Sequence, residues 1–489
     1  IIALILIAAI SALVANQAPA QKRRSRAPTG TVGQTEAWRR RPPQPDQLKP
    51  FELPATRETL LKNGLRLVMA EDHRMPLVTA RLSLTVGSAD DPEGSAGLAE
   101  AIAHLVTEGA GRRDSEELAR EVERLGARLS AAAADDYSSI GFASIAENAE
   151  RMIELLADVV LRPTFADEEV ALFKENRIQE LKVQRQEPAF VVSEQFNRLV
   201  YGSHPYAVSA PTPETVAAMT RSQIASYYRS RYTPSGSVIV IVGDFDSKKI
   251  EDRVKSAFGE WPKASAARTE SVSMPEPAPR RIYLVDRPGS EQADFRIGGL
   301  AISRSHPDYF ALLVANAILG DGASSRLFLN IRERKGYAYE VNSQVNAPRQ
   351  RGTFFGESQT RTEVTSAAIK EMLAEFQRMR RERVTARDLE NAKSYLTGLF
   401  SLILSTQGGL VSQMAETRLL GLGPDYLSSY RARISAVTAE QVQRVAQKYI
   451  QPDRAVIVVV GDAAKLKKAL QTIGPVEVID TEGKGAARS

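Results

Sequence analysis

The sequence predicts an α+β fold: two homologous α/β-roll domains, each an antiparallel-rich sheet flanked by helices, that form a clam-like body with a cleft between them. A repeat carries this prediction. The apolar run at 238–242 ends at Gly243-Asp244, and a matching run at 456–460 ends at Gly461-Asp462, 218 residues later. Similarity at a fixed period indicates duplicated structural units. Further pairs repeat at this offset: Thr220 and Thr438, Gln223 and Gln441, Ile224 and Val442, Pro234 and Pro452.

The length and local composition of the chain support two domains joined by a linker. The chain has 489 residues, and a domain takes about 100–200 residues. Ala, Ser and Pro dominate 262–281, which we predict to be the linker between an N-terminal domain at 55–261 and a C-terminal domain at 282–489. Ligand sites favour interfaces between domains, so the cleft is the expected functional region.

The elements of the first domain can be predicted in order along the chain. Apolar runs at 65–69 and 78–86, bounded by Gly64 and by Gly87-Ser88, predict strands. Residues 94–108 show helical spacing, because Leu98, Ile102 and Leu105 fall on one face. The run at 238–242 predicts a short buried strand that closes the domain. Further helices are expected at 115–129, 146–160 and 167–184.

The start of the chain resembles a secretory signal peptide. Residues 1–14 are almost wholly apolar, and Ala18-Pro19-Ala20 supplies the small residues of a cleavage site, although the usual basic start is missing. We therefore predict a signal peptide at 1–20, truncated at its start, and a secreted or periplasmic location. The alternative is a membrane anchor, but the run is shorter than the about 20 apolar residues that a spanning helix needs.

The positive charge of the chain is concentrated in a Pro- and Arg-rich segment at 21–54, which we predict to be a linker. The net charge is +5, and residues 21–50 hold eight basic and two acidic side chains, so the rest of the chain is close to neutral. This distribution does not favour nucleic acid as a partner. The chain has no cysteine, which excludes disulfides, thiolate zinc sites and cysteine nucleophiles.

The segment GSADDPEGSAGLAEAIAHLVTEG at 87–109 resembles the pitrilysin/insulinase family of zinc metallopeptidases, including members similar to the mitochondrial processing peptidase. Active members carry H-x-x-E-H on this helix: two histidines at i and i+4 bind zinc, and the glutamate is the general base. At these positions the chain has Glu100, Ala103 and His104. The resemblance places the distal metal ligand at Glu180, on the helix expected at 167–184.

The resemblance therefore implies a degenerate metal site. Glu100, His104 and Glu180 are the vestigial candidates for metal ligands, and no catalytic residue is confirmed, because the base position is Ala103. Loss of a positioned base removes about 10²–10⁴-fold in rate. Two alternatives stay open: His104 is hydrogen-bonded to Glu100 or Glu180 instead of a metal, or the three groups form a variant metal site with Glu175 or Glu108 as the base.

A second family-like segment, LGDGASSRLFLNIRERKGYAYEVNS at 319–343, resembles the substrate-clamping element of the C-terminal domain. The resemblance assigns Arg332 and Tyr339 to substrate binding, with Arg334 as a competing choice for the arginine. An arginine offers a fork of donors to a peptide carbonyl or carboxylate, and a tyrosine donates to a carbonyl oxygen. The alternative is a surface arginine and a core tyrosine.

Together these features predict a non-catalytic, substrate-binding subunit of a heterodimeric zinc metallopeptidase that acts on peptides or small unfolded proteins. Its partner would be a catalytic pitrilysin/insulinase-family subunit. No cofactor of its own is expected, and zinc enters only if the vestigial site still binds it or through the partner chain. The alternatives are an active metalloendopeptidase with a Glu100/His104/Glu180 site, and a structural or peptide-binding protein without a proteolytic role.

Overall fold

The computed structural model of the chain describes residues 52–263, 272–276 and 278–480. Residues 51–489 form one compact unit. The predicted signal peptide at 1–20 and nearly all of the predicted linker at 21–54 lie outside the described residues, as do 264–271 and 277 of the predicted linker at 262–281. Within the described residues, no helix combines the length and the apolar character that crossing a membrane requires.

Two six-stranded sheets with the same kind of strand order form the frame of the compact unit. Antiparallel pairs predominate, and the described parallel pairs are β2 with β6 in the first sheet and β7 with β11 and β12 in the second. The first sheet has the order β1 (Thr56–Leu60), β2 (Arg66–Glu71), β6 (Val238–Gly243), β3 (Leu77–Leu84), β5 (Ser138–Ile145), β4 (Arg128–Ala133). The second has the order β12 (Val476–Ile479), β7 (Arg281–Asp286), β11 (Val456–Gly461), β8 (Gln292–Leu300), β10 (Thr353–Arg361), β9 (Ala338–Asn346).

The repeated sequence positions occupy matching structural positions in the two halves. The runs at 238–242 and 456–460 form β6 and β11, which are covered on both faces and therefore apolar at successive residues. Thr220 is the N-cap of α7 (Arg221–Arg231) and Thr438 that of α14 (Ala439–Tyr449). Each threonine Oγ1 accepts a hydrogen bond from the backbone N–H three residues on, at 3.2 Å in both halves. The predicted α+β duplication is confirmed.

The remaining helices cover the sheets. In the first half they are α1 (Leu98–Leu105), α2 (Ser115–Arg124), α3 (Ala149–Leu161), α4 (Asp167–Gln184), α5 (Pro188–Tyr201), α6 (Pro213–Ala218) and α8 (Ser247–Phe258). In the second half they are α9 (Tyr309–Leu319), α10 (Thr365–Arg381), α11 (Ala386–Leu404), α12 (Gln407–Leu419), α13 (Tyr426–Ser435) and α15 (Ala463–Leu470).

Two predicted helices are shorter in the structure than the sequence pattern suggested. The helix expected at 115–129 ends at Arg124, because Gly126 adopts φ +57 and the chain enters β4 at Arg128. A left-handed glycine just past the last turn is a common helix terminator. The helix expected at 94–108 is α1, which begins after Gly97 at φ +98. The helix expected at 167–184 has those bounds in the structure.

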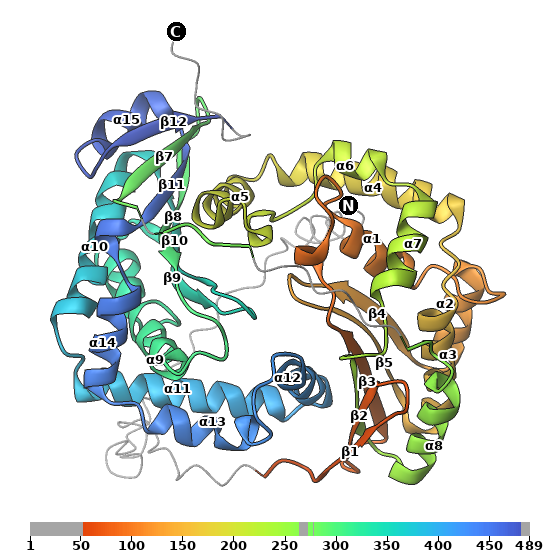
Figure 1. The fold of residues 1–489 in the computed structure, drawn as a ribbon. Coiled ribbons are helices and arrows are strands. Elements are labelled where there is room, and N and C mark those ends of the chain that lie inside the picture. The colour runs from red at the N-terminus through yellow and green to blue at the C-terminus, as the bar shows by residue number, and fades with distance from the viewer. Residues whose placement is uncertain (1–51, 264–271, 277, 481–489) are drawn as a thin grey trace, which may run out of the picture. The chain divides into compact units, whose positions relative to one another are not determined.

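Each half also places one helix against the sheet of the other half, an exchange that the sequence did not predict. Helix α5 packs on β8 and β11 (Figure 1). Its Val192 and Phe196 join a cluster with Phe355 and Val458. Helix α12 packs on β3 and β6. Its Met414 lies in the cluster that holds Val240 of β6. Each sheet is therefore covered on one face by its own helices and on the other by a helix from the opposite half of the sequence.

Candidate functional site

The helix that carries the degenerate motif is held at its N-terminus by Asp91. This carboxylate accepts the backbone N–H of Gly97 at 2.8 Å and that of Ala99 at 3.0 Å. Burial raises the pKa of Asp91 to about 7, against the lowering effect of these hydrogen bonds. Leu98, Ile102 and Leu105 are buried. Because residues at i and i+4 share a helix face, the other face presents Glu100 and His104 together.

Glu100 and His104 line a cavity of about 220 Å³. The opposite wall is α4, which contributes Phe173, Asn176, Arg177 and Glu180 at i, i+3, i+4 and i+7, the spacing of one helix face. The third wall is Ala131–Ala133 of β4, the edge strand of the first sheet. The structure therefore brings the three vestigial metal-ligand candidates to one cavity, together with Ala103 at the base position.

A cationic side chain, Arg177, joins the two carboxylates of this cavity. Its Nε lies 2.7 Å from Glu100 Oε1, and its Nη1 lies 3.3 Å from Glu180 Oε2. Its Nη2 donates a hydrogen bond to Glu100 Oε2 at 3.4 Å. The Arg177 side chain is only 11% exposed. Burial raises the pKa of Glu100, and the Arg177 charge opposes this rise. The guanidinium thus supplies, from within the chain, a positive charge between the two acids.

Among the described residues, His104 forms no hydrogen bond with Glu100 or Glu180. The alternative in which one of these carboxylates accepts a hydrogen bond from His104 is therefore wrong. The exposed ring of His104 instead packs against Phe173, with ring centroids 5.2 Å apart. The reason is that Arg177 engages both carboxylates. Phe173 supplies an apolar surface for the imidazole.

These residues do not fit a zinc ion. No group of three or more His, Asp or Glu side chains among the described residues converges as metal ligands would. A divalent cation between Glu100 and Glu180 would lie beside the Arg177 guanidinium, and like charges at such separations repel strongly where water is partly excluded. Ala103 presents a methyl group to the cavity and cannot accept a proton. Neither alternative base is among the described residues that line this cavity: Glu175 is exposed on another face of α4, and Glu108 follows the end of α1.

The structure brings Arg332 and Tyr339 together in the second half. Arg332 belongs to a π-helical turn, η5 (Phe328–Arg334), and Tyr339 lies at the start of β9, the edge strand of the second sheet. The Arg332 guanidinium stacks on the Phe328 ring and on the Tyr339 ring, each at 4.7 Å from the ring centroid. Tyr339 is 83% exposed, so it is not a core tyrosine. Arg334 donates instead to the Leu329 carbonyl of its own turn, at 3.1 Å.

Sequence reasoning singled out the correct helices but missed Arg177. The available signal was its spacing: it precedes Glu180 by three residues, which places both on one helix face. Together with the glutamate at position 100, an arginine at position 177 indicates an ion pair within the chain in place of a bound cation.

Comparison with known proteins places both halves of the chain in one group. Residues 66–214 match the sequence family described as insulinase (peptidase family M16), and residues 218–396 match the one described as the peptidase M16 inactive domain. The uncharacterized zinc protease YmxG of Bacillus subtilis is 25% identical over 403 residues, which cover 81% of this chain and 96% of that protein. An uncharacterized zinc protease of Streptomyces coelicolor is 26% identical over 404 residues, which cover 80% of this chain and 86% of that protein.

Solved structures give the same picture of the fold. The peptidase M16 inactive domain structure from Pseudomonas fluorescens superposes with a TM-score of 0.77 at 26% identity, covering 83% of this chain and 98% of that chain. A protease structure from Helicobacter pylori superposes with a TM-score of 0.77 at 20% identity, covering 83% of this chain and 100% of that chain. The second likeness concerns the fold alone.

Proposed function

Because the chain belongs to the insulinase family of peptidases (M16), we propose that it is a non-catalytic subunit that binds extended peptides beside a catalytic relative. One observation supports the proposal most strongly: Arg177 occupies the space between Glu100 and Glu180 where a metal would have to lie. The methyl group of Ala103 stands at the base position. The arginine competes with a cation for the two acids, and the base position offers no proton acceptor.

The edge strand β4 supports a role in peptide binding. It pairs with β5 on one side and lies at the end of its sheet, so its other side offers backbone N–H and C=O groups to an added strand. The small side chains of Ala131–Ala133 border the cavity of α1 and α4, which leaves room for the side chain of a bound segment. The proposed ligand is therefore an extended stretch of peptide or of a small unfolded protein, held mainly through its backbone.

The paired Arg332 and Tyr339 provide a second contact for such a ligand. A tyrosine ring that is held by an arginine and exposed to water has a hydroxyl free to donate to a peptide carbonyl. In the proposed heterodimer the zinc and the general base belong to the partner chain, and this chain contributes the binding surface. A secreted or periplasmic location remains part of the proposal, because it rests on the signal-like sequence at 1–20.

The test measures binding and hydrolysis separately. The purified chain is mixed with a labelled, extended Ala- and Ser-rich peptide, and anisotropy reports binding while a quenched fluorescent peptide library reports cleavage. We expect binding, no cleavage with added zinc, and cleavage only after a relative with a complete H-x-x-E-H motif is added. Replacing Arg332 and Tyr339 together by alanine should weaken binding by about tenfold or more, whereas the matched control Arg334→Ala should leave it unchanged.

Two results would contradict the proposal in different ways. Cleavage by the chain alone that a chelator stops and Glu180→Ala abolishes would establish the variant metallopeptidase. If peptide does not bind, and the Arg332→Ala/Tyr339→Ala chain still supports every complex that the unchanged chain forms, a structural role without peptide recognition would replace the one proposed here.

A further inference from the structure

We propose that a second cavity, in the C-terminal half, binds a small monocarboxylate that carries an apolar or aromatic group. The cavity has a volume of about 560 Å³, within the range of ligand pockets, about 300–1,000 Å³. It lies between the loop before α9, the helix α9 itself, and the turn that leads into α13. Its residues belong to the second half of the chain, so this inference does not rest on the proposed function of α1 and α4.

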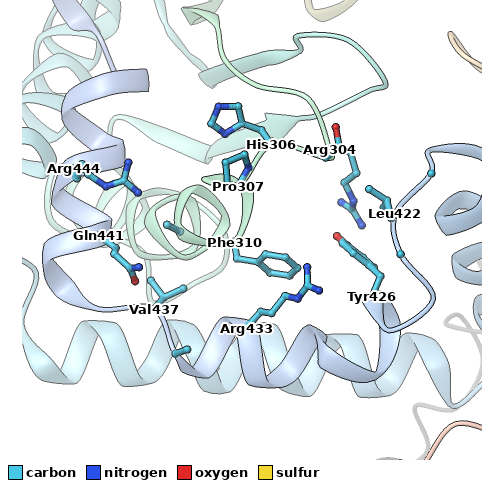
Figure 2. A pocket seen from close by; sticks show the side chains of 15 residues that line it. Arg304, His306, Pro307, Phe310, Leu422, Tyr426, Arg433, Val437, Gln441 and Arg444 are labelled. Carbon is cyan, nitrogen blue, oxygen red and sulfur yellow. The ribbon is translucent and has the colours of Figure 1, made fainter.

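Three polar groups converge at one end of this cavity. Figure 2 shows the guanidinium groups of Arg304 and Arg433 and the hydroxyl of Tyr426 turned toward one another beside the ring of Phe310. The Arg433 guanidinium lies 5.5 Å from the Phe310 ring centroid and 5.8 Å from that of Tyr426. Two arginine forks and a hydroxyl donor around one point match the acceptor geometry of a carboxylate. The adjacent aromatic ring offers a flat apolar surface.

Arg304 provides the charge that this cavity leaves uncompensated. Its guanidinium is stacked between Tyr309, at 4.4 Å from the ring centroid, and Tyr426, at 5.7 Å. Its Nη1 donates to the Tyr309 hydroxyl, but its buried Nε has no hydrogen-bond partner. Among the described residues, no carboxylate lies within ion-pair distance of Arg304. A partly buried guanidinium without a counter-ion is costly unless a ligand supplies the negative charge.

Tyr426 adds a hydroxyl whose proton has no acceptor among the described residues. The residue is 4% exposed, and its hydroxyl faces Arg304 but forms no hydrogen bond of normal geometry. Burial raises the pKa of Tyr426, so the hydroxyl keeps its proton at neutral pH. Buried hydroxyls in folded proteins nearly always have partners. A ligand oxygen at this end of the cavity would satisfy both Tyr426 and Arg304.

The charge balance favours a monoanion over a phosphate dianion. Arg433 is paired with Asp425 at 3.0 Å, and Arg444 is paired with Asp308 at 2.6 Å. Of the three arginines that line the cavity, Arg304 is the one that forms no ion pair with a described carboxylate. The apolar side of the cavity, formed by Phe310, Leu422 and Val437, suits a hydrophobic substituent. Two sources carry this chemistry: the C-terminal residue of a peptide, and a free aromatic acid.

Isothermal titration calorimetry of the full chain distinguishes these sources and tests the site. The probes are N-acetyl-phenylalanine, its amide, 3-phenylpropionate and inorganic phosphate. We expect N-acetyl-phenylalanine to bind with one site per chain, and its amide and phosphate to bind at least about tenfold more weakly, because a carboxylate held by charged donors carries the contact. Equal affinity for 3-phenylpropionate would assign the site to free aromatic acids; weaker affinity would assign it to peptide C-termini.

Substitutions link the binding to these residues. Arg304→Gln should weaken the binding of N-acetyl-phenylalanine by about tenfold or more. Tyr426→Phe should weaken this binding by a smaller factor. The control Arg381→Gln changes an exposed arginine of the same half and should have no effect. Tyr426→Phe removes only an unpaired hydroxyl, so it keeps the test valid if Arg304→Gln does not fold. Binding of the amide as tight as that of the acid, or affinities unchanged by both substitutions, would overturn the proposal.

Discussion

In the first half, α1 turns Glu100 and His104 toward a cavity, whereas in the second half α9 buries nearly every side chain among the sheet and its neighbouring helices. The strand orders and the capped helices α7 and α14 match, so the frame does not explain the difference. The polar Asn316 of α9 is buried and accepts a hydrogen bond from Ser343 Oγ at 2.8 Å. Helix α1 therefore presents polar side chains to its cavity, whereas α9 contributes the apolar Phe310 and Ala311 to the cavity of the second half.

The two halves also differ in the charges that line their cavities. In the first half, Arg177 neutralises two acids and closes an internal ion-pair network. In the second half, Arg304 has aromatic neighbours and no carboxylate among the described residues. In the first half a cation of the chain itself lies between two acids, whereas in the second half Arg304 forms no ion pair with a described carboxylate.

The largest expected effect comes from returning a metal site to the first half. We expect Glu100→His, Ala103→Glu and Arg177→Ala together to give a chain that retains one zinc ion after dialysis, because two histidines at i and i+4 and Glu180 then face one point without a competing guanidinium. Metal content measured by atomic emission checks this. A chain with only Glu100→His and Ala103→Glu should bind zinc at least about tenfold more weakly, since Arg177 remains. One zinc ion per molecule of the unchanged chain would contradict the inference that Arg177 excludes a metal from this cavity.

The exchange of α5 and α12 predicts that the halves unfold together. Phe196 of α5 is fully buried against the second sheet, with its ring centroid 5.7 Å from that of Phe355. Phe196→Ala should cost about 3–5 kcal/mol, and Met414→Ala on α12 about 2–5 kcal/mol. Urea denaturation followed by circular dichroism should show one transition for each variant. The exposed Val183→Ala should change stability by less than about 0.5 kcal/mol. A split transition would show that the halves are independent.

Removing Arg177 alone should produce a pH-dependent loss of stability. Burial already raises the pKa of Glu100 in the folded chain, which means that stability falls as pH rises from the unfolded value near 4.5 through the folded pKa. Without Arg177 that pKa rises further, so the deficit is small at pH 4–5 and full at pH 8. Because Glu100 and Glu180 are partly exposed, the full deficit should be about 1 kcal/mol.

Thermal unfolding at pH 5 and pH 8 checks this dependence. Arg177→Lys keeps the positive charge and should recover most of the stability that Arg177→Ala loses at pH 8. An Arg177→Ala chain whose deficit is the same at both pH values would show that the arginine acts through packing of its stem and not through its charge.

Much of the frame could be predicted from the sequence because it depends on local and repeated patterns. The sequence repeats the apolar runs of β6 and β11 at a fixed distance along the chain, and it repeats the two threonine caps at the same distance. The end of α2 was missed because a single glycine, Gly126, outweighs several residues with helical spacing. The exchange of α5 was missed because an apolar helix face does not say which sheet it covers.

The candidate site divides in the same way. The family resemblance led to α1, α4 and the Arg332/Tyr339 pair, and the structure brings each group together. The contact of Arg177 with Glu100 and the cavity around Arg304 each join separate segments, and such contacts leave no periodic signal in the sequence. An aromatic-flanked arginine without a carboxylate partner can be recognised only once its neighbours in space are known.

The matched N-caps allow the same atom to be removed in both halves. Thr220→Ala and Thr438→Ala each remove a cap that accepts the N–H of Gln223 or Gln441 at 3.2 Å. Each should cost about 1 kcal/mol, measured by urea denaturation, and replacement by serine should recover most of it. Thr438 also forms a capping box, because its backbone N–H donates to Gln441 Oε1 at 2.9 Å. Alanine at position 438 keeps this backbone N–H, so each alanine variant loses one side-chain hydrogen bond. A clear difference between the two losses of stability would show that the matched caps do not contribute equally in the two halves.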